Sequence, residues 1–337
     1  MTVKTMREAL NEALFQEMRR DPGVIVIGED VSGGAGGSSG SRDAAGGIFG
    51  VTKGLMGEFG DKRVIDTPIS ESAIIGLANG AALAGMRPVA ELMFADFVGV
   101  AMDQIYNQMA KFRYMFGGKA KAPIVVRMSM GAGMNAAAQH SQTIYSMLSA
   151  VPGLKVVVPS NPADAKGMLA AAIRDDDPVI FLEHKALYSS KGEVPDGEYV
   201  APLHGASLVQ SGKDATVVTL GRMVSFAAKA AAKLAGDGIT VDLIDLRSTS
   251  PIDEEMILES LSLTGRLVVV DESNPVCSIA SEIAAIAAEK GFASLRAPVV
   301  RVTAPHTPVP FARELERMYV PGPDRIEAAI RKAVKGE

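Results

Sequence analysis

Apolar positions along the chain follow two alternating periods, and each period predicts a different element. In the first twenty residues the apolar side chains recur every three or four positions, which is typical of a helix with one buried face. Thr5 and Glu8 have the spacing of a capping box, so we expect that helix to begin at Thr5. An Asp-Pro-Gly turn at 21–23 should end it, and the continuous apolar run 24–27 predicts a fully buried strand.

The same alternation continues to about residue 187. We expect further strands at 63–65, 88–92, 123–128, 155–159 and 178–183, with helices at 98–116, 143–150 and 162–175 between them. Buried strands that alternate with helices favour a parallel, doubly wound sheet. From 188 to 206 the pattern lapses into Gly, Pro, Lys and Asp, which predicts a linker between domains.

A second series of the same kind follows the linker. Its predicted strands are 215–220, 240–246, 266–271 and 299–302, and its predicted helices are 224–235, 253–260, 278–290 and 324–335. The fold class is therefore expected to be α/β, with two doubly wound domains at 1–187 and 207–337 joined by a linker at 188–206. A chain of 337 residues is long enough for two such domains.

Composition narrows the function classes. The formal net charge is −5 and no run of lysines and arginines occurs, so we expect no nucleic-acid surface. Cys277 is the only cysteine, which rules out an intrachain disulfide and a thiolate zinc site and fits a reducing compartment such as the cytoplasm. No signal-peptide pattern opens the sequence and no apolar run approaches 18 residues, so we expect neither export nor a membrane span.

Three common ligand-binding and catalytic motifs are absent from the sequence. No Gly-x-Gly-x-x-Gly follows a predicted strand, so a dinucleotide site has no support, and neither a P-loop nor a Gly-x-Ser-x-Gly elbow occurs. The tripeptide Gly236-Asp237-Gly238 resembles part of a metal–diphosphate signature, but no Asn follows at the needed distance. We therefore expect a simple helix-to-strand turn there.

The stretch 66–80 carries the first candidate for chemistry. It leaves a short strand, turns at Pro68 and enters a helix of small residues, with Glu71 in the turn ahead of an apolar helix face. A carboxyl group buried without a counter-charge favours its protonated form and can exchange a proton near neutral pH. Glu71 could equally be a carboxylate on the positive end of a helix dipole. The residues alone leave both interpretations open.

Two loops are further candidates. Residues 32–47 include seven glycines and follow the carboxyl end of a strand, where open α/β sheets place ligand sites; a functional loop and a tolerated insertion are both open. His140 lies in a run of Ala, Gln and Ser, and imidazole suits proton transfer at neutral pH. A histidine at a helix start without chemistry is the alternative. We expect the other histidines to be structural or at the surface: His184, His204 and His306.

These motifs together resemble a known enzyme family. Residues 71–80 fit Glu-x4-Gly, an apolar residue, two further residues and Gly, a pattern of the pyrimidine-binding subunits of thiamine-diphosphate enzymes. Over essentially its whole length the chain resembles the beta subunit of 2-oxo-acid dehydrogenase E1 components. The segments that carry this resemblance, in family order, are 66–71, 91–97, 103–104, 137–142, 152–157 and 164–167. The segments that resemble the acetoin dehydrogenase type are 33–47, 50–55, 111–118 and 302–310.

The resemblance implies a fold and an activity. The first domain would be a transketolase-like pyrimidine-binding domain and the second a transketolase C-terminal-like domain. The chain would use thiamine diphosphate to cleave acetoin to acetaldehyde, with transfer of the acetyl unit to lipoamide on an E2 acyltransferase. The alternatives are a beta subunit that acts on pyruvate or another 2-oxo acid, a non-catalytic scaffold that binds E2, and a dinucleotide-dependent dehydrogenase, which the missing fingerprint disfavours.

The resemblance also implies roles for individual residues. Glu71 would hydrogen-bond N1′ of the cofactor's aminopyrimidine, Phe97 would stack on that ring, and Ile69 would line its pocket. Met93 would also contact the cofactor, but it stands where branched-chain relatives have a polar Gln, so no hydrogen bond is expected from it. His140 would face the substrate and handle its charge or protons. From the residues alone, Phe97 could instead be a core aromatic.

The family's diphosphate and Mg²⁺ ligands, a Gly-Asp-Gly followed by Asn, are missing from this sequence. The resemblance places them on a separate alpha subunit, so we expect an α2β2 heterotetramer and no activity from this chain alone. Gly76, Gly80 and Ala84 lie four residues apart and would let helices approach closely, either at such an interface or within the chain.

Some relatives bind a monovalent cation, and the resemblance implies a K⁺ site here. Oxygen-only ligation suits such a hard cation. A polar turn at a helix end is the alternative interpretation of the same residues. The candidate ligands are Ala122, Ile124, Val125, Ala172, Asp175 and Asp177.

Overall fold

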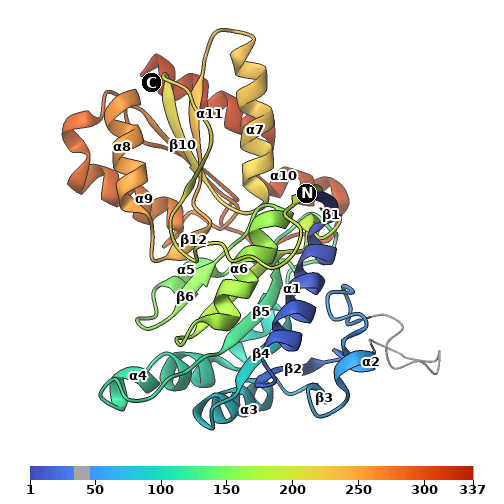
Figure 1. Ribbon diagram of the computed structural model, residues 1–337. Helices are drawn as coiled ribbons and strands as arrows, with labels where there is room; N and C mark the ends of the chain where they lie inside the picture. Colours follow the sequence, from blue (N-terminus) through green and yellow to red (C-terminus); the bar gives the residue numbers. More distant parts are fainter. Residues whose placement is uncertain (34–45, 337) are drawn as a thin grey trace. The chain divides into compact units, whose positions relative to one another are not determined.

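The computed structural model describes residues 1–33 and 46–336 of the chain (Figure 1). They form two compact units, Met1–Met130 with Met147–Leu203, and Gly131–Ser146 with His204–Glu337. Segment Gly131–Ser146 lies within the sequence range expected for the first domain, yet it packs with the second unit. Most of the predicted glycine-rich loop, residues 34–45, lies outside the described residues.

The first unit is built on a parallel sheet with the strand order β6-β7-β5-β4-β2-β3. Its strands are β2 (Val24–Glu29), β3 (Val64–Thr67), β4 (Arg87–Phe94), β5 (Val125–Met130), β6 (Lys155–Val157) and β7 (Val179–His184). Its helices are α1 (Met6–Arg20), α2 (Leu55–Phe59), α3 (Glu71–Leu83), α4 (Phe112–Met115) and α6 (Pro162–Arg174), and α5 (Tyr145–Ser149) begins in the segment that packs with the second unit. The α/β fold with parallel strands is confirmed.

The predicted capping box at the start of α1 is present. The Glu8 N–H donates to Thr5 Oγ1 at 3.2 Å, and the Thr5 N–H donates to Glu8 Oε2 at 2.8 Å. Met6, Leu10 and Leu14 on one face of the helix are fully buried, and α1 packs beside α6, as Figure 1 shows. Burial of this apolar face fixes both helices against the sheet.

The prediction of one continuous helix at 98–116 was wrong. The chain forms a 3₁₀ turn η1 (Ala95–Gly99), a π-helical turn η2 (Gln104–Met109) and the short α4. Asn79 of α3 donates to the carbonyl of Gln104 at 3.0 Å, at the start of the π-helical turn. A side chain that enters the helical hydrogen-bond ladder in this way interrupts regular α-helix, and single-sequence periodicity does not reveal it.

A small antiparallel pair completes the first unit. β1 (Thr2–Thr5) pairs with β8 (Lys191–Val194), so part of the predicted linker 188–206 belongs to a strand. Both strands are short and largely polar, and their alternation carries little signal. The sequence analysis therefore did not predict them.

The second unit has its own sheet, in the order β14-β13-β10-β11-β9. The first four strands are parallel and the edge strand β9 is antiparallel to β11. The strands of this sheet are β9 (Ser207–Gln210), β10 (Ala215–Thr219), β11 (Val241–Asp245), β13 (Leu267–Asp271) and β14 (Val300–Thr303), and the short strand β12 (Ser248–Ser250) lies outside it. The helices are α7 (Arg222–Ala235), α8 (Glu254–Thr264), α9 (Ile279–Lys290), α10 (Arg313–Tyr319) and α11 (Pro323–Lys335). The sequence analysis missed β9, β12 and α10.

Among the described residues, no helix combines the length and the apolar character needed to cross a membrane.

Candidate active site

Glu71 is the first residue of α3, just beyond the carboxyl end of β3, and its side chain is half-buried. The preceding Ser70 gives the helix no side-chain cap, and its hydroxyl instead donates to the Pro68 carbonyl at 3.1 Å. The positive end of the α3 dipole favours negative charge at this position. This location agrees with both interpretations of Glu71, the proton-handling group and the helix-start carboxylate.

A second carboxylate, Glu29, lies at the same edge of the sheet. Glu29 ends β2 and stands opposite Thr67 of the parallel strand β3. Burial raises the pKa of Glu29, and the negative charges of Asp30 and Glu71 raise it further. The sequence analysis missed Glu29, although it follows the predicted buried strand 24–27 and carboxyl ends of parallel strands share one edge.

Ile69, Met93 and Phe97 lie at the ends of β3 and β4, on either side of β2. The Ile69 side chain is 76% exposed. Phe97, in η1, is half-buried and meets the ring of Phe94 edge to face, with 5.7 Å between the ring centres. Half-buried Met93 lies at an irregularity in the pairing of β4 with β5. All three residues lie at the same carboxyl edge of the sheet as Glu71.

A buried ion cluster lies behind this edge and joins three neighbouring strands. Arg127 of β5 binds both carboxylate oxygens of Glu183 in β7 at 2.7 and 2.8 Å, and Glu91 of β4 at 2.6 Å. The Tyr188 hydroxyl donates to Glu183 at 2.7 Å. Burial raises the pKa of Glu91, although the Arg127 charge acts in the opposite direction. Because each charge is paired, the cluster fixes β4, β5 and β7 relative to one another behind Met93.

His140 is half-buried and lies in the segment 131–146, which packs with the second unit. The Gly131 N–H donates to the Gln142 carbonyl at 3.2 Å and closes a loop around His140. Further along, the Tyr145 hydroxyl hydrogen-bonds to Asp271, at the end of β13. Tyr145 is fully buried, and its pKa is raised by burial and by the neighbouring carboxylate charges. The segment that carries His140 is therefore held to the rest of the second unit by a buried hydrogen bond.

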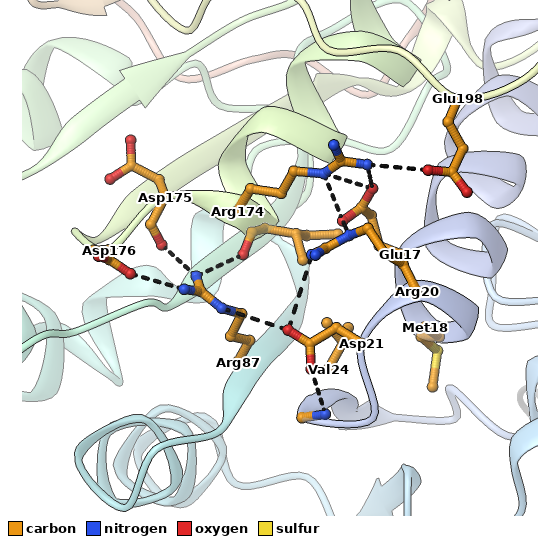
Figure 2. Close-up of polar contacts among 12 residues, drawn as sticks. Glu17, Met18, Arg20, Asp21, Val24, Arg87, Arg174, Asp175, Asp176 and Glu198 are labelled. Carbon is orange, nitrogen blue, oxygen red and sulfur yellow. Dashed lines mark hydrogen bonds and ion pairs between the residues drawn. The ribbon is translucent and has the colours of Figure 1, made fainter.

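The carboxylates of the candidate K⁺ ligands Asp175 and Asp177 face basic side chains. Lys155 Nζ lies 2.6 Å from Asp175 and 3.7 Å from Asp177, and Arg113 binds Asp177. Figure 2 shows the Asp175 carbonyl turned toward Arg87, whose Nη1 donates to it at 2.8 Å. The positive charge that a cation would bring is already present at these side chains.

The other candidate K⁺ ligands are backbone carbonyls. Ala122, Ile124 and Ala172 each accept a backbone N–H bond, and Val125 begins β5. A carbonyl oxygen has a second lone pair, so one hydrogen bond does not exclude a further contact. The geometry therefore fits ligation by backbone oxygens better than ligation by the two carboxylates.

The tripeptide at 236–238 is a turn after α7, as predicted. Asp237 pairs with Arg331 of α11, and Gly238 has a φ of +78°, which favours glycine. Across residues 1–33 and 46–336, no group of three or more His, Cys, Asp or Glu side chains is placed to hold a metal ion.

Comparison with known proteins places these features in context. The family described as "Transketolase, pyrimidine binding domain" matches residues 3–191, and "Transketolase, C-terminal domain" matches residues 204–326. The beta subunit of an acetoin:2,6-dichlorophenolindophenol oxidoreductase from Cupriavidus necator is 56% identical, over 98% of both chains. The protein of the same name from Bacillus subtilis is 55% identical, over 96% of this chain and 95% of its own.

A more distant relative and a solved structure complete the comparison. The beta subunit of the pyruvate dehydrogenase E1 component of Bacillus subtilis is 41% identical, over 99% of this chain and 100% of its own. A solved structure described as "Split gene transketolase, inactive beta4 tetramer" superposes with a TM-score of 0.77 over 98% of each chain. Its identity is 24%, so it supports the fold alone.

Proposed function

The chain belongs to the family of beta subunits of thiamine-diphosphate-dependent acetoin and 2-oxo-acid dehydrogenase E1 components, and from this premise we propose that it serves in the cleavage of acetoin. The products would be acetaldehyde and an acetyl unit that passes to lipoamide on an E2 partner. The observation that carries the proposal is Glu71 at the start of α3, beside exposed Ile69 at the carboxyl edge of the sheet. The names of the two relatives at 55–56% identity favour acetoin over pyruvate, which occurs in the name of a relative at 41%.

Thiamine diphosphate fits the residues at this edge. Glu71 would accept or share a proton at N1′ of the aminopyrimidine, because a carboxylate at a helix start can hold a proton donor there. Ile69, Met93 and Phe97 would contact the faces and edge of the ring with apolar atoms, and Met93 would do so without a hydrogen bond. When bound, the cofactor would supply a nucleophilic carbon and an electron sink.

His140 would act on the substrate side. Its imidazole, held on a loop anchored to the second unit, would donate or accept a proton at the substrate's oxygen.

An alpha subunit would supply what this chain lacks. The family resemblance places the ligands for Mg²⁺ and diphosphate on that subunit, in an α2β2 heterotetramer. The exposed face of α3 supports such an interface, because Leu77 is 50% exposed and a Cβ added at Gly80 would meet nothing within 4 Å. At Gly76 an added Cβ would make an ordinary contact with Gln104 of the same chain, 3.6 Å away, so this position gives no support to the interface.

The K⁺ site and the cytoplasmic location stay predictions. A K⁺ ion would have to use backbone carbonyls, since Lys155 and Arg113 already neutralise Asp175 and Asp177. Its proposed effect is to stabilise the turn that follows α6.

Co-expression with the alpha subunit tests the proposal. The α/β complex should reduce an indophenol dye with acetoin only when thiamine diphosphate and Mg²⁺ are present, and the isolated chain should show no activity. Unchanged dye reduction after removal of the cofactor would refute thiamine-diphosphate dependence. A complex that forms and binds E2 without any turnover would instead support the non-catalytic scaffold.

A further inference from the structure

The loop that carries His140, residues 131–142, holds an unfavourable backbone conformation. Asn135 and Ala137 have φ values of 55° and 62°, in the left-handed region that side chains other than glycine seldom adopt. Ala137 is the less favourable of the two, because asparagine tolerates this region and alanine does not. The loop keeps this shape only if contacts from outside it compensate.

Glu316 of α10 supplies the main contact. Its side chain is 3% exposed. The Gly133 N–H donates to Oε1 at 2.8 Å, and the Asn135 N–H lies 3.0 Å from Oε2 and 3.3 Å from Oε1. Hydrogen bonds to an ionised acceptor are about twice as strong as neutral ones. These bonds fix the N–H of Asn135, the first left-handed residue, and that of Gly133 two positions before it.

Two further charged side chains hold the start of the loop. The Ala132 N–H donates to Glu272 at 2.7 Å, and the Ala132 carbonyl accepts from Arg222 at 2.9 Å. Gly133 is required beside them, since a Cβ there would lie 2.0 Å from Arg222 Nη1 and its φ is +104°. The loop is therefore held by side chains from α7, the end of β13 and α10.

We propose that Glu316 is a positioning residue for His140, and this inference rests on the catalytic role proposed for His140. Glu316 touches neither substrate nor cofactor in this account. It holds the backbone at Gly133 and Asn135, seven and five residues before His140, so its loss would let the imidazole move away from its working position. A displacement of about 1 Å at a reacting group can reduce a rate by about 100-fold.

The test is a double-mutant cycle in the α/β complex. Glu316→Gln keeps the size of the side chain but replaces one accepting oxygen by an NH2 group and removes the negative charge, so the bonds to that oxygen are lost and the bonds to the other are no longer charge-assisted. We expect kcat for acetoin-dependent dye reduction to fall about tenfold or more. Glu314→Gln alters an exposed glutamate on the same helix and should leave kcat unchanged.

The decisive arm combines Glu316→Gln with His140→Ala. If Glu316 acts through His140, adding Glu316→Gln to His140→Ala should change kcat less than about twofold, because residues that act as a unit are not additive. An undiminished additional loss would overturn the positioning role while leaving the role of His140 intact. Full activity of His140→Ala would instead overturn the proposed role of His140, and the positioning role with it.

One further variant and one binding measurement separate a loss of positioning from a loss of folding. Glu316→Asp keeps the charge on a shorter side chain and replaces Glu316→Gln in the cycle if that variant does not assemble with the alpha subunit. Binding of thiamine diphosphate, measured by titration, should be unchanged in the single variant, since the proposed pyrimidine contacts lie in the other compact unit. A loss of cofactor affinity as large as the loss of kcat would mean general unfolding and would contradict the inference.

Discussion

Replacing Glu71 by Gln separates the two interpretations of this residue. The change keeps the size of the side chain and its place at the first position of α3, and removes the negative charge and the capacity to hold and return a proton. If Glu71 exchanges a proton with the cofactor's ring nitrogen, Glu71→Gln should remove most of the activity. If it is only a helix-start carboxylate, the effect should be confined to stability.

The magnitudes of the two outcomes differ widely. General acid–base catalysis contributes about 10²–10⁴-fold, which corresponds to about 3–5 kcal/mol of transition-state stabilisation at 1.36 kcal/mol per tenfold. A helix-dipole interaction contributes about 0.3–1 kcal/mol, and loss of the repulsion with Glu29 offsets part of that in the variant. We therefore expect kcat to fall at least about 100-fold while the melting temperature changes by no more than about 4 °C.

Steady-state dye reduction by the α/β complex and thermal unfolding provide the assay. Glu8→Gln is the matched control, because Glu8 is another first-turn glutamate, exposed, in the capping box of α1. It should cost about 1 kcal/mol of stability and leave kcat unchanged. A Glu71→Gln complex that keeps more than about a tenth of the wild-type kcat would refute the proton-handling role.

Four further predictions rest on the described contacts. Glu17, 1% exposed, is bound by Arg174 and Arg20, both a third exposed, so Glu17→Gln should cost about 2–3 kcal/mol in urea unfolding; a loss below about 0.5 kcal/mol would contradict the pairing. The pKa of Glu29 is raised in the folded chain, so the folded state binds this proton more tightly than the unfolded state does. The free energy of unfolding should therefore fall as pH rises from the unfolded-state pKa of Glu29 to its folded-state pKa. Measured by urea unfolding, Glu29→Gln should match the wild type below this pH range and be more stable than the wild type above it. Gly80→Leu should fold normally but fail to co-purify with the alpha subunit, whereas intact assembly would exclude the α3 face as the interface. Lys155→Met removes the charge that pairs with Asp175, so a K⁺ ion at this turn should bind the variant more tightly than the wild type. Exchange of K⁺ for Na⁺ should therefore shift the melting temperature of the variant more than that of the wild type, and equal shifts would show that Lys155 does not compete with the ion.

The sequence predicted the regular parts of the fold because local signals agreed with the tertiary structure there. The capping box at Thr5 placed the start of α1 correctly, and apolar runs placed the strands of both sheets. The helix predicted at 98–116 failed because Asn79, on another element, contacts the Gln104 carbonyl. The strands β1 and β8 were missed because each is stabilised by a partner about 190 residues away and not by its own pattern.

Some residues of the candidate site could be named from the sequence, and others could not. Glu71 was singled out by its place in a turn after a predicted strand, whereas Ile69 and Phe97 were named only through the family resemblance, and all three roles stay predictions. Glu316 could not be found by that reasoning, because its partners Gly133 and Asn135 lie about 180 residues earlier and bind through backbone N–H groups. Backbone donors leave no residue-type signal in a sequence.

The substrate preference of the assembled complex tests the central claim most directly. The complex with the alpha subunit, supplied with thiamine diphosphate, Mg²⁺ and a dye acceptor, would be compared on acetoin, pyruvate and branched 2-oxo acids. An acetoin-cleaving E1 component should show a kcat/KM for acetoin at least about tenfold above the values for the oxo acids. Equal or higher kcat/KM for pyruvate would contradict the account.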